Sequence, residues 1–104
     1  MKFRWKPAKP EELKAKGRPS FEEVIEAIAE GRVIDSESNQ NYPGQTILIV
    51  DIPSKSPLLC AVPITQIGDE FFLHTVFPSK KYTQRYKGSK VKDHGKKKTN
   101  QKES

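Results

Sequence analysis

The side chains best suited to chemistry gather in the C-terminal part of the sequence. Lys80, Lys81 and Arg85 lie within six residues of one another, soon after an apolar run that ends at Phe77. If a strand ends there and a helix begins, the positive end of the helix dipole adds to the three side-chain charges. Such a group would hold a phosphodiester and stabilise the extra charge of a pentacovalent transition state. Spacing alone favours a plainer interpretation, a solvated C-terminal helix.

Two other side chains are candidates for proton transfer. His74 lies in the last predicted strand, and an ordinary histidine titrates near neutrality, which suits a general acid or base. Tyr42 lies in a polar loop, where it would donate a proton, stack on a base or simply cover the core. Cys60 lies nearly opposite His74 if the two strands form a hairpin centred near Ile67, so a Cys–His nucleophilic pair is geometrically possible. A cysteine among apolar neighbours more often fills a core.

A second basic group, mixed with aromatic residues, lies near the start of the chain. Lys6 and Lys9 follow Phe3 and Trp5. Basic residues between aromatic rings bind single-stranded nucleic acid by phosphate contact and base stacking. Alternation along a strand favours a different arrangement, with the two rings facing the core and the basic side chains facing solvent.

Neither a metal nor another cofactor is expected. The two histidines, His74 and His94, have no Cys, His or acidic partner at ligand spacing, and there is no Gly-rich phosphate loop. Any hydrolysis would then be metal-independent and would use cationic and hydroxyl groups. The single cysteine fits a reducing compartment. No apolar run approaches the roughly 20 residues of a membrane span, and the N-terminus lacks the apolar stretch of a signal peptide. We therefore expect a cytoplasmic protein that does not bind a membrane.

Charge and composition divide the chain into a body and a tail. Residues 87–104 hold seven of the 19 basic residues and two of the 13 acidic ones. The sequence pI of about 9.5 is therefore mostly a property of that segment. We predict a single domain over residues 1–87, followed by a disordered lysine-rich tail over residues 88–104.

The elements that position the candidate residues follow from periodicity. After a short helix, a second one begins at the capping box Ser20–Glu23 and ends at Gly31. Beyond Gly31 the period changes to 2, and Pro63 is expected at an edge or a bulge. Short turns between strands imply antiparallel pairing. The predicted fold is α+β, with helices over 11–16 and 20–31, a four-stranded antiparallel meander over 32–35, 46–52, 58–64 and 70–77, and a short C-terminal helix over 80–86.

Both ends of the predicted domain resemble the BrnT-type toxins of bacterial type II toxin–antitoxin systems. The N-terminal pattern is Phe3-x-Trp5-x-Pro7-x-Lys9, then Gly17 and Ser20-Phe21-Glu22-Glu23-Val24. The C-terminal one is a strand ending at Phe77, then Pro78-Ser79-Lys80-Lys81-Tyr82-Thr83. The sequence departs from the family pattern at three places. Lys80 and Lys81 occupy positions where the family favours arginines, and Thr75 occupies a position where an arginine is expected. The loop 36–45 is also longer than expected.

The resemblance implies a RelE-like fold and a metal-independent endoribonuclease, neutralised by a small antitoxin that also binds DNA. In this hypothesis the RNA 2′-hydroxyl attacks the adjacent phosphate. Lys80, Lys81 and Arg85 would stabilise the negative charge of the transition state. His74 or Tyr42 would transfer protons. Lys6 and Lys9 would bind the RNA backbone. Two alternatives stand beside it: a non-catalytic module that binds RNA or an antitoxin, and an accessory protein whose tail alone contacts nucleic acid.

Overall fold

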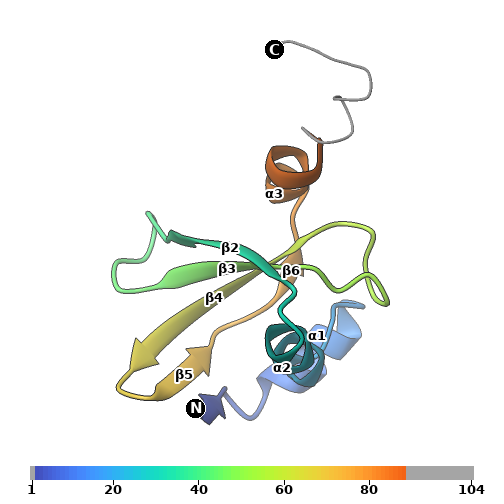
Figure 1. Cartoon of the computed structure of the whole chain (residues 1–104). Helices are drawn as coiled ribbons and strands as arrows, with labels where there is room; N and C mark the ends of the chain where they lie inside the picture. The colour runs from blue at the N-terminus through green and yellow to red at the C-terminus, as the bar shows by residue number, and fades with distance from the viewer. Residues whose placement is uncertain (1, 89–104) are drawn as a thin grey trace.

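The computed structural model describes residues 2–88, which form three helices, a C-terminal π-helical turn and one mixed sheet. Figure 1 shows α1 and α2 together on one side of the sheet and α3 on the other. The elements in chain order are β1 (Lys2–Arg4), α1 (Lys9–Ala15), α2 (Phe21–Ala29), β2 (Val33–Ser38), β3 (Thr46–Val50), β4 (Cys60–Ile67), β5 (Glu70–Leu73), β6 (Phe77–Pro78), α3 (Lys80–Thr83) and the π-helical turn η1 (Gln84–Gly88).

The predicted capping box starts α2. Ser20 Oγ accepts a hydrogen bond from Glu23 N at 3.1 Å, and the Glu23 carboxylate accepts one from Ser20 N at 2.8 Å. The helix then buries Phe21, Val24 and Ala27 against the sheet. The sequence periodicity favours an apolar face of Val24, Ile25, Ile28 and Ala29. Of these Val24 is buried, Ile25 and Ile28 are partly buried and Ala29 is exposed, so the helix is confirmed while its buried face is turned toward Phe21 and Ala27.

The α+β class and the three helices are confirmed, while the predicted number of strands was wrong. The consecutive strands β2, β3, β4 and β5 pair antiparallel, as predicted. The sheet is nevertheless mixed, because β1 pairs in parallel with β5 and β6 pairs with β4. The first residues are not among the four predicted strands. They become a strand because the outer edge of β5 offers unpaired backbone groups.

Pro63 explains why one predicted strand, 70–77, is two short ones. It lies inside the central strand β4 rather than at an edge. His74 N donates to Pro63 O at 2.9 Å, but proline has no N–H with which to return the second bond of the pair. Pairing therefore lapses after His74, and β6 resumes it where Phe77 lies opposite Ala61.

The sheet buries apolar side chains on both faces. The inner face, which α1 and α2 cover, carries the larger core, including Val50, Val62 and Leu73. On the opposite face, here called the outer face, Tyr82 of α3 packs with a smaller group of Ile49, Leu59 and Ala61. The predicted tail, residues 88–104, lies outside the described residues apart from Gly88.

Replacing Ser20 with alanine should lower the free energy of unfolding by about 1 kcal/mol, because Glu23 N loses its acceptor, Ser20 Oγ. Urea denaturation followed by circular dichroism measures the loss. Ser54→Ala, at an exposed turn position, is the matched control and should change stability by less than about 0.5 kcal/mol. Equal stability of the two variants would contradict the capping account.

Candidate active site on the outer sheet face

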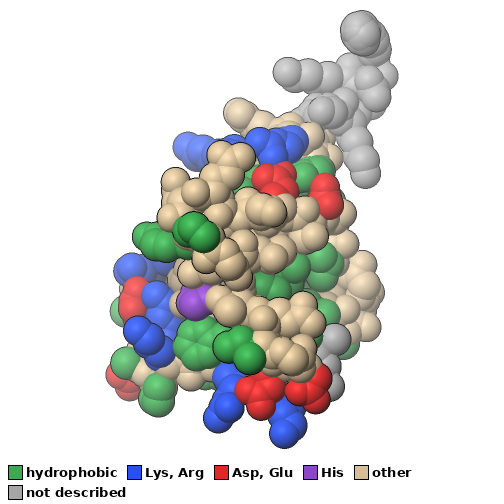
Figure 2. Space-filling view, turned by 90° about the vertical axis from the view of Figure 1, so that its left-hand side faces the viewer, with side chains coloured by type: hydrophobic (Ala, Val, Ile, Leu, Met, Phe, Trp, Pro, Cys, Tyr) green, Lys and Arg blue, Asp and Glu red, His purple; other side chains and the backbone are tan. Residues whose placement is uncertain are grey.

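Strand alternation places a row of polar and aromatic side chains on the outer face beyond α3. Arg4 pairs with Phe72 across β1 and β5, and Phe72 pairs with Thr65 across β5 and β4. Residues in register across a sheet point to the same face. His74 follows Phe72 by two positions, so it also points outward. Figure 2 shows the histidine at the surface, with Lys and Arg side chains above and beside it.

A hollow of about 440 Å³ brings three of the predicted catalytic residues together. Tyr42, His74 and Lys81 all line it, although they come from a loop, the end of β5 and α3. We call it the central hollow. Its remaining walls are formed by Asn39, Asn41, Gln45, Ile47, Pro63, Thr75, Phe77, Ser79 and Tyr82.

His74 is held by its neighbours and its ring favours the neutral form. Nε2 lies 2.7 Å from Thr65 Oγ1, a hydrogen bond between the two side chains. The ring also meets Phe72 edge-on, with centroids 5.0 Å apart. Burial, and then the positive charge of Lys6, lower the pKa of His74 from its ordinary value. A neutral imidazole can accept a proton, which is what a general base must do.

A short turn presents Tyr42 to the central hollow. The polar loop is shorter than predicted, because β2 continues to Ser38. Asn39 N donates to Gln45 O at 3.0 Å and their side-chain amides bond at 3.1 Å, which closes the turn. Gly44 has φ 87°, a conformation that glycine tolerates and that the second central position of a Pro-Gly type II turn requires. The Tyr42 side chain is therefore exposed at the edge of the hollow, not a lid over the core.

The three basic residues predicted to bind a phosphate have different surroundings. Lys81 and Arg85 line a second hollow of about 390 Å³ beside the central one. Both cations lie over the Tyr82 ring, at 5.1 Å and 5.4 Å from its centroid. Arg85 also forms an ion pair with Glu37, which offsets its charge. Lys80 is exposed and lines neither hollow. Lys81 is thus the best placed of the three to meet a phosphate.

The C-terminal helix is too short and irregular to supply the helix dipole that we expected to add positive charge at the site. α3 spans four residues and continues as the π-helical turn η1, whereas a regular helix over 80–86 was predicted. Ser79 caps α3 by accepting a hydrogen bond from Tyr82 N at 3.2 Å. Thr83 Oγ1 in turn accepts from Leu59 N at 2.8 Å and donates to Ser79 O. These bonds fasten α3 to β4, and the positive charge near the site comes from side chains.

Lys6 and Lys9 lie on the β1 side of the same histidine. They line a hollow of about 230 Å³ together with Phe72 and His74. Lys9 Nζ is paired with the Glu12 carboxylate at 2.9 Å. No ion pair of Lys6 is found within residues 2–88. His74 thus borders both hollows, with Lys6 on one side and Lys81 on the other.

The structure rules out the Cys60–His74 pair that the sequence left possible, and it confirms the favoured interpretation that Cys60 fills the core. Ile67 pairs with Glu70, so the hairpin is centred between Gly68 and Asp69 and not near Ile67. This register places Cys60 opposite Pro78 and on the inner face, whereas His74 faces outward. Burial raises the pKa of the Cys60 thiol to about 11, which keeps it protonated and unreactive.

Three site residues were missed by the sequence reasoning. Thr65 bonds His74, and Phe72 contacts its ring. Thr75 was noted only as a departure from a family pattern, yet its Oγ1 is buried in the wall of the central hollow without a hydrogen-bond partner among the described residues. Period-2 alternation from His74 back to Phe72 was the available signal for Phe72. Thr65 required the hairpin register, which the sequence reasoning had displaced.

Comparisons with known proteins assign no role to this site. The chain matches no protein-family model, no curated protein and no solved structure. Within residues 2–88, no three His, Cys, Asp or Glu side chains are grouped so that they could share a metal ion. In the same part of the chain, no helix is long and apolar enough to cross a membrane.

The pKa of His74 should lie below the ordinary histidine value of about 6.5. His74 then binds its proton more tightly in the unfolded chain than in the folded one. The free energy of unfolding should therefore fall as the pH drops below about 6.5 and through the folded-state pKa of His74. Titration of the imidazole NMR signals measures the first effect and urea denaturation at several pH values the second.

Lys6→Gln should raise the pKa of His74, because it removes the positive charge that opposes protonation. Lys14→Gln, an exposed lysine on α1, is the matched control and should leave the pKa unchanged. A His74 pKa at or above 6.5 in the wild type would contradict the described environment.

Proposed function

We propose that the protein is a metal-independent endoribonuclease, the toxin of a type II toxin–antitoxin pair related to the BrnT-type toxins with a RelE-like fold. One observation carries the proposal: the central hollow gathers His74, Tyr42 and Lys81, a proton acceptor, a proton donor and a cation. Two N-terminal helices, the antiparallel run from β2 to β5 and the basic C-terminal segment support the family assignment.

In the proposed reaction the RNA 2′-hydroxyl attacks the adjacent phosphorus. His74, neutral because its pKa is lowered, accepts the 2′-hydroxyl proton. As the bond between phosphorus and the 5′ oxygen breaks, Tyr42 gives that oxygen a proton. His74 then releases the proton it accepted to solvent, and Tyr42 regains one from solvent, which restores both groups. The products are a 2′,3′-cyclic phosphate and a 5′-hydroxyl end, and every proton is accounted for.

Lys81 would offset the negative charge that grows on the non-bridging phosphate oxygens. Its place between the central hollow and the second hollow favours it over Lys80. Arg85, already paired with Glu37, would contact the RNA backbone rather than the reacting phosphate. Lys6 and Lys9 would bind backbone phosphates on the far side of His74. The Thr75 hydroxyl, buried in the wall, would gain a partner when substrate or water fills the hollow.

Neutralisation by a partner is part of the same proposal. A cytoplasmic ribonuclease without an inhibitor would degrade the RNA of its own cell, and the toxin family that the chain resembles is inhibited by a small DNA-binding antitoxin. Such an antitoxin would act most simply by covering the central hollow. Growth arrest on expression, relieved by coexpression of the product of a neighbouring gene, is the expected behaviour.

A non-catalytic module that binds nucleic acid or protein is the second candidate. The Arg85–Glu37 ion pair favours it, because it offsets one of the three cations predicted to stabilise the transition state. In that case the outer face would bind RNA without cutting it.

Purified protein should cleave single-stranded RNA in the presence of EDTA. His74→Gln should slow single-turnover cleavage by about 10²- to 10⁴-fold, the usual contribution of a general base. Lys81→Ala should slow it more than Lys80→Ala, since only Lys81 lines the hollow. Lys14→Ala is the matched control for lost charge and should cleave at the wild-type rate.

Three results would separate the candidates. Undiminished cleavage by a variant carrying both Lys80→Ala and Lys81→Ala would refute the site assignment. RNA binding without cleavage under all conditions would favour the non-catalytic module. Loss of all nucleic-acid binding on removal of residues 88–104 would favour the accessory-protein alternative, whereas the proposed enzyme should still cleave.

A further inference from the structure

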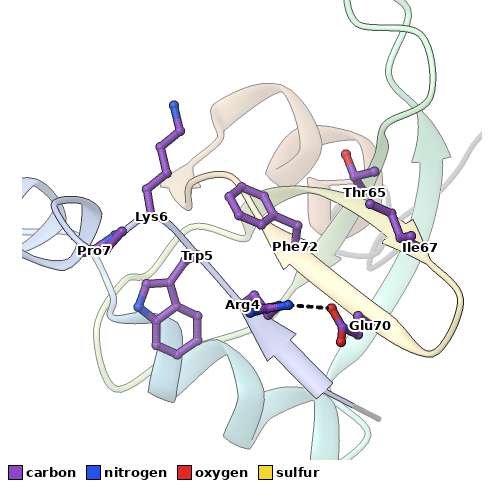
Figure 3. Close-up of a pocket in the computed structure, with 8 residues that line it drawn as sticks. All are labelled: Arg4, Trp5, Lys6, Pro7, Thr65, Ile67, Glu70 and Phe72. Carbon is purple, nitrogen blue, oxygen red and sulfur yellow. Dashed lines mark hydrogen bonds and ion pairs between the residues drawn. The ribbon is translucent and has the colours of Figure 1, made fainter.

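A further hollow on the outer face lies beside Phe72, apart from the central hollow. It measures about 520 Å³ and contains the Phe72 side chain. Figure 3 shows the Phe72 ring between Lys6 and Thr65, with the Arg4–Glu70 ion pair crossing from β1 to β5. We call it the lateral hollow. Its lining is Arg4, Trp5, Lys6, Pro7, Thr65, Ile67, Glu70 and Phe72.

The lateral hollow combines apolar surface with positive charge. Phe72 is only partly buried, and Ile67 beside it is 70% exposed. Trp5 is a fixed part of the lining, because its ring points toward the inner core and packs on Phe21 of α2 with centroids 5.0 Å apart. The Arg4 guanidinium is held at 3.0 Å from the Glu70 carboxylate, and Lys6 carries a charge with no ion pair in residues 2–88. A flat apolar ligand bearing a negative group matches this surface.

A nucleotide of an RNA strand has those properties. A nucleobase is a flat ring that stacks on aromatic side chains, and its phosphate is attracted by lysine. The Phe72 and His74 rings are 5.0 Å apart, so a base on Phe72 would lie directly beside the imidazole. Lys6 lines both the lateral hollow and the hollow that His74 borders, which places its charge between the two.

We propose that the lateral hollow is a nucleobase-binding subsite, in which the base of an unpaired RNA nucleotide stacks on Phe72 and an adjoining phosphate contacts Lys6. The inference rests on the proposed function, because it takes RNA as the ligand. It adds a requirement for single-stranded substrate, since the bases of a duplex are already stacked on one another and cannot reach the ring. Phe72 is then a substrate-binding residue that also orients the strand at His74.

Binding of a short 2′-O-methyl RNA strand to the full chain tests the subsite. The methyl group blocks attack by the 2′ oxygen, so binding is measured without cleavage. Phe72→Ala should weaken binding by about 5- to 150-fold, the effect of one lost base–aromatic stack. Phe72→Tyr should restore it, because the aromatic face returns. Phe71→Leu, on the same strand but facing the inner core, is the matched control and should bind as the wild type does.

Two further probes show that the base is what Phe72 recognises. A strand of abasic nucleotides, and the same sequence in a duplex, should each bind with affinities that Phe72→Ala does not alter. The chain has one tryptophan, and Trp5 lines the lateral hollow, so its fluorescence should change when the intact strand binds. The abasic strand should leave that fluorescence nearly unchanged.

The outcomes separate this inference from the proposed function. Equal binding of the intact strand by the wild type and Phe72→Ala overturns the subsite, even if unmodified RNA is cleaved and His74→Gln abolishes the cleavage. Base-dependent binding without any cleavage supports the subsite and overturns the endoribonuclease. A chain that binds neither the intact nor the abasic strand overturns both.

Discussion

The register of the β4–β5 hairpin determines which side chains can meet a substrate. Gly68 adopts φ 63°, a left-handed conformation that allows the tight turn, and Ile67 pairs with Glu70. From this pairing Phe72 and His74 point to the outer face while Leu73 enters the inner core. A slip of one residue would exchange the two sets, exposing Leu73 and burying the histidine. The inner core therefore fixes the orientation of His74, because leaving Leu73 in solvent would be unfavourable.

Charge pairing then distinguishes among the many basic residues. Three of them form ion pairs with carboxylates: Arg4 with Glu70, Lys9 with Glu12, and Arg85 with Glu37. Ion pairs at an exposed surface contribute little to stability, so their main effect here is to orient side chains and to lower the local field. Lys6 and Lys81 lie on opposite sides of His74 and give the site its positive character.

The local elements were predictable from the sequence and the long-range pairings were not. The capping box of α2, the alternating apolar strands and the Ser79 start of α3 each follow from residues within a few positions of one another. The parallel pairing of β1 with β5 joins residues almost seventy positions apart, and a three-residue strand has no periodicity to reveal it. For the site, the types of His74, Tyr42 and Lys81 were sufficient to select them. The partnership of His74 with Thr65, and its separation from Cys60, depended on a register that is set by packing.

The pH dependence of single-turnover RNA cleavage tests the central claim most directly. If neutral His74 is the general base, the cleavage rate falls as the pH drops through the His74 pKa determined by NMR, and levels off above it. Because Lys6 lowers that pKa, Lys6→Gln shifts the NMR titration and the rate profile upward together. A rate that is independent of pH across the His74 titration, or a profile that does not follow the NMR value in this variant, would contradict the account.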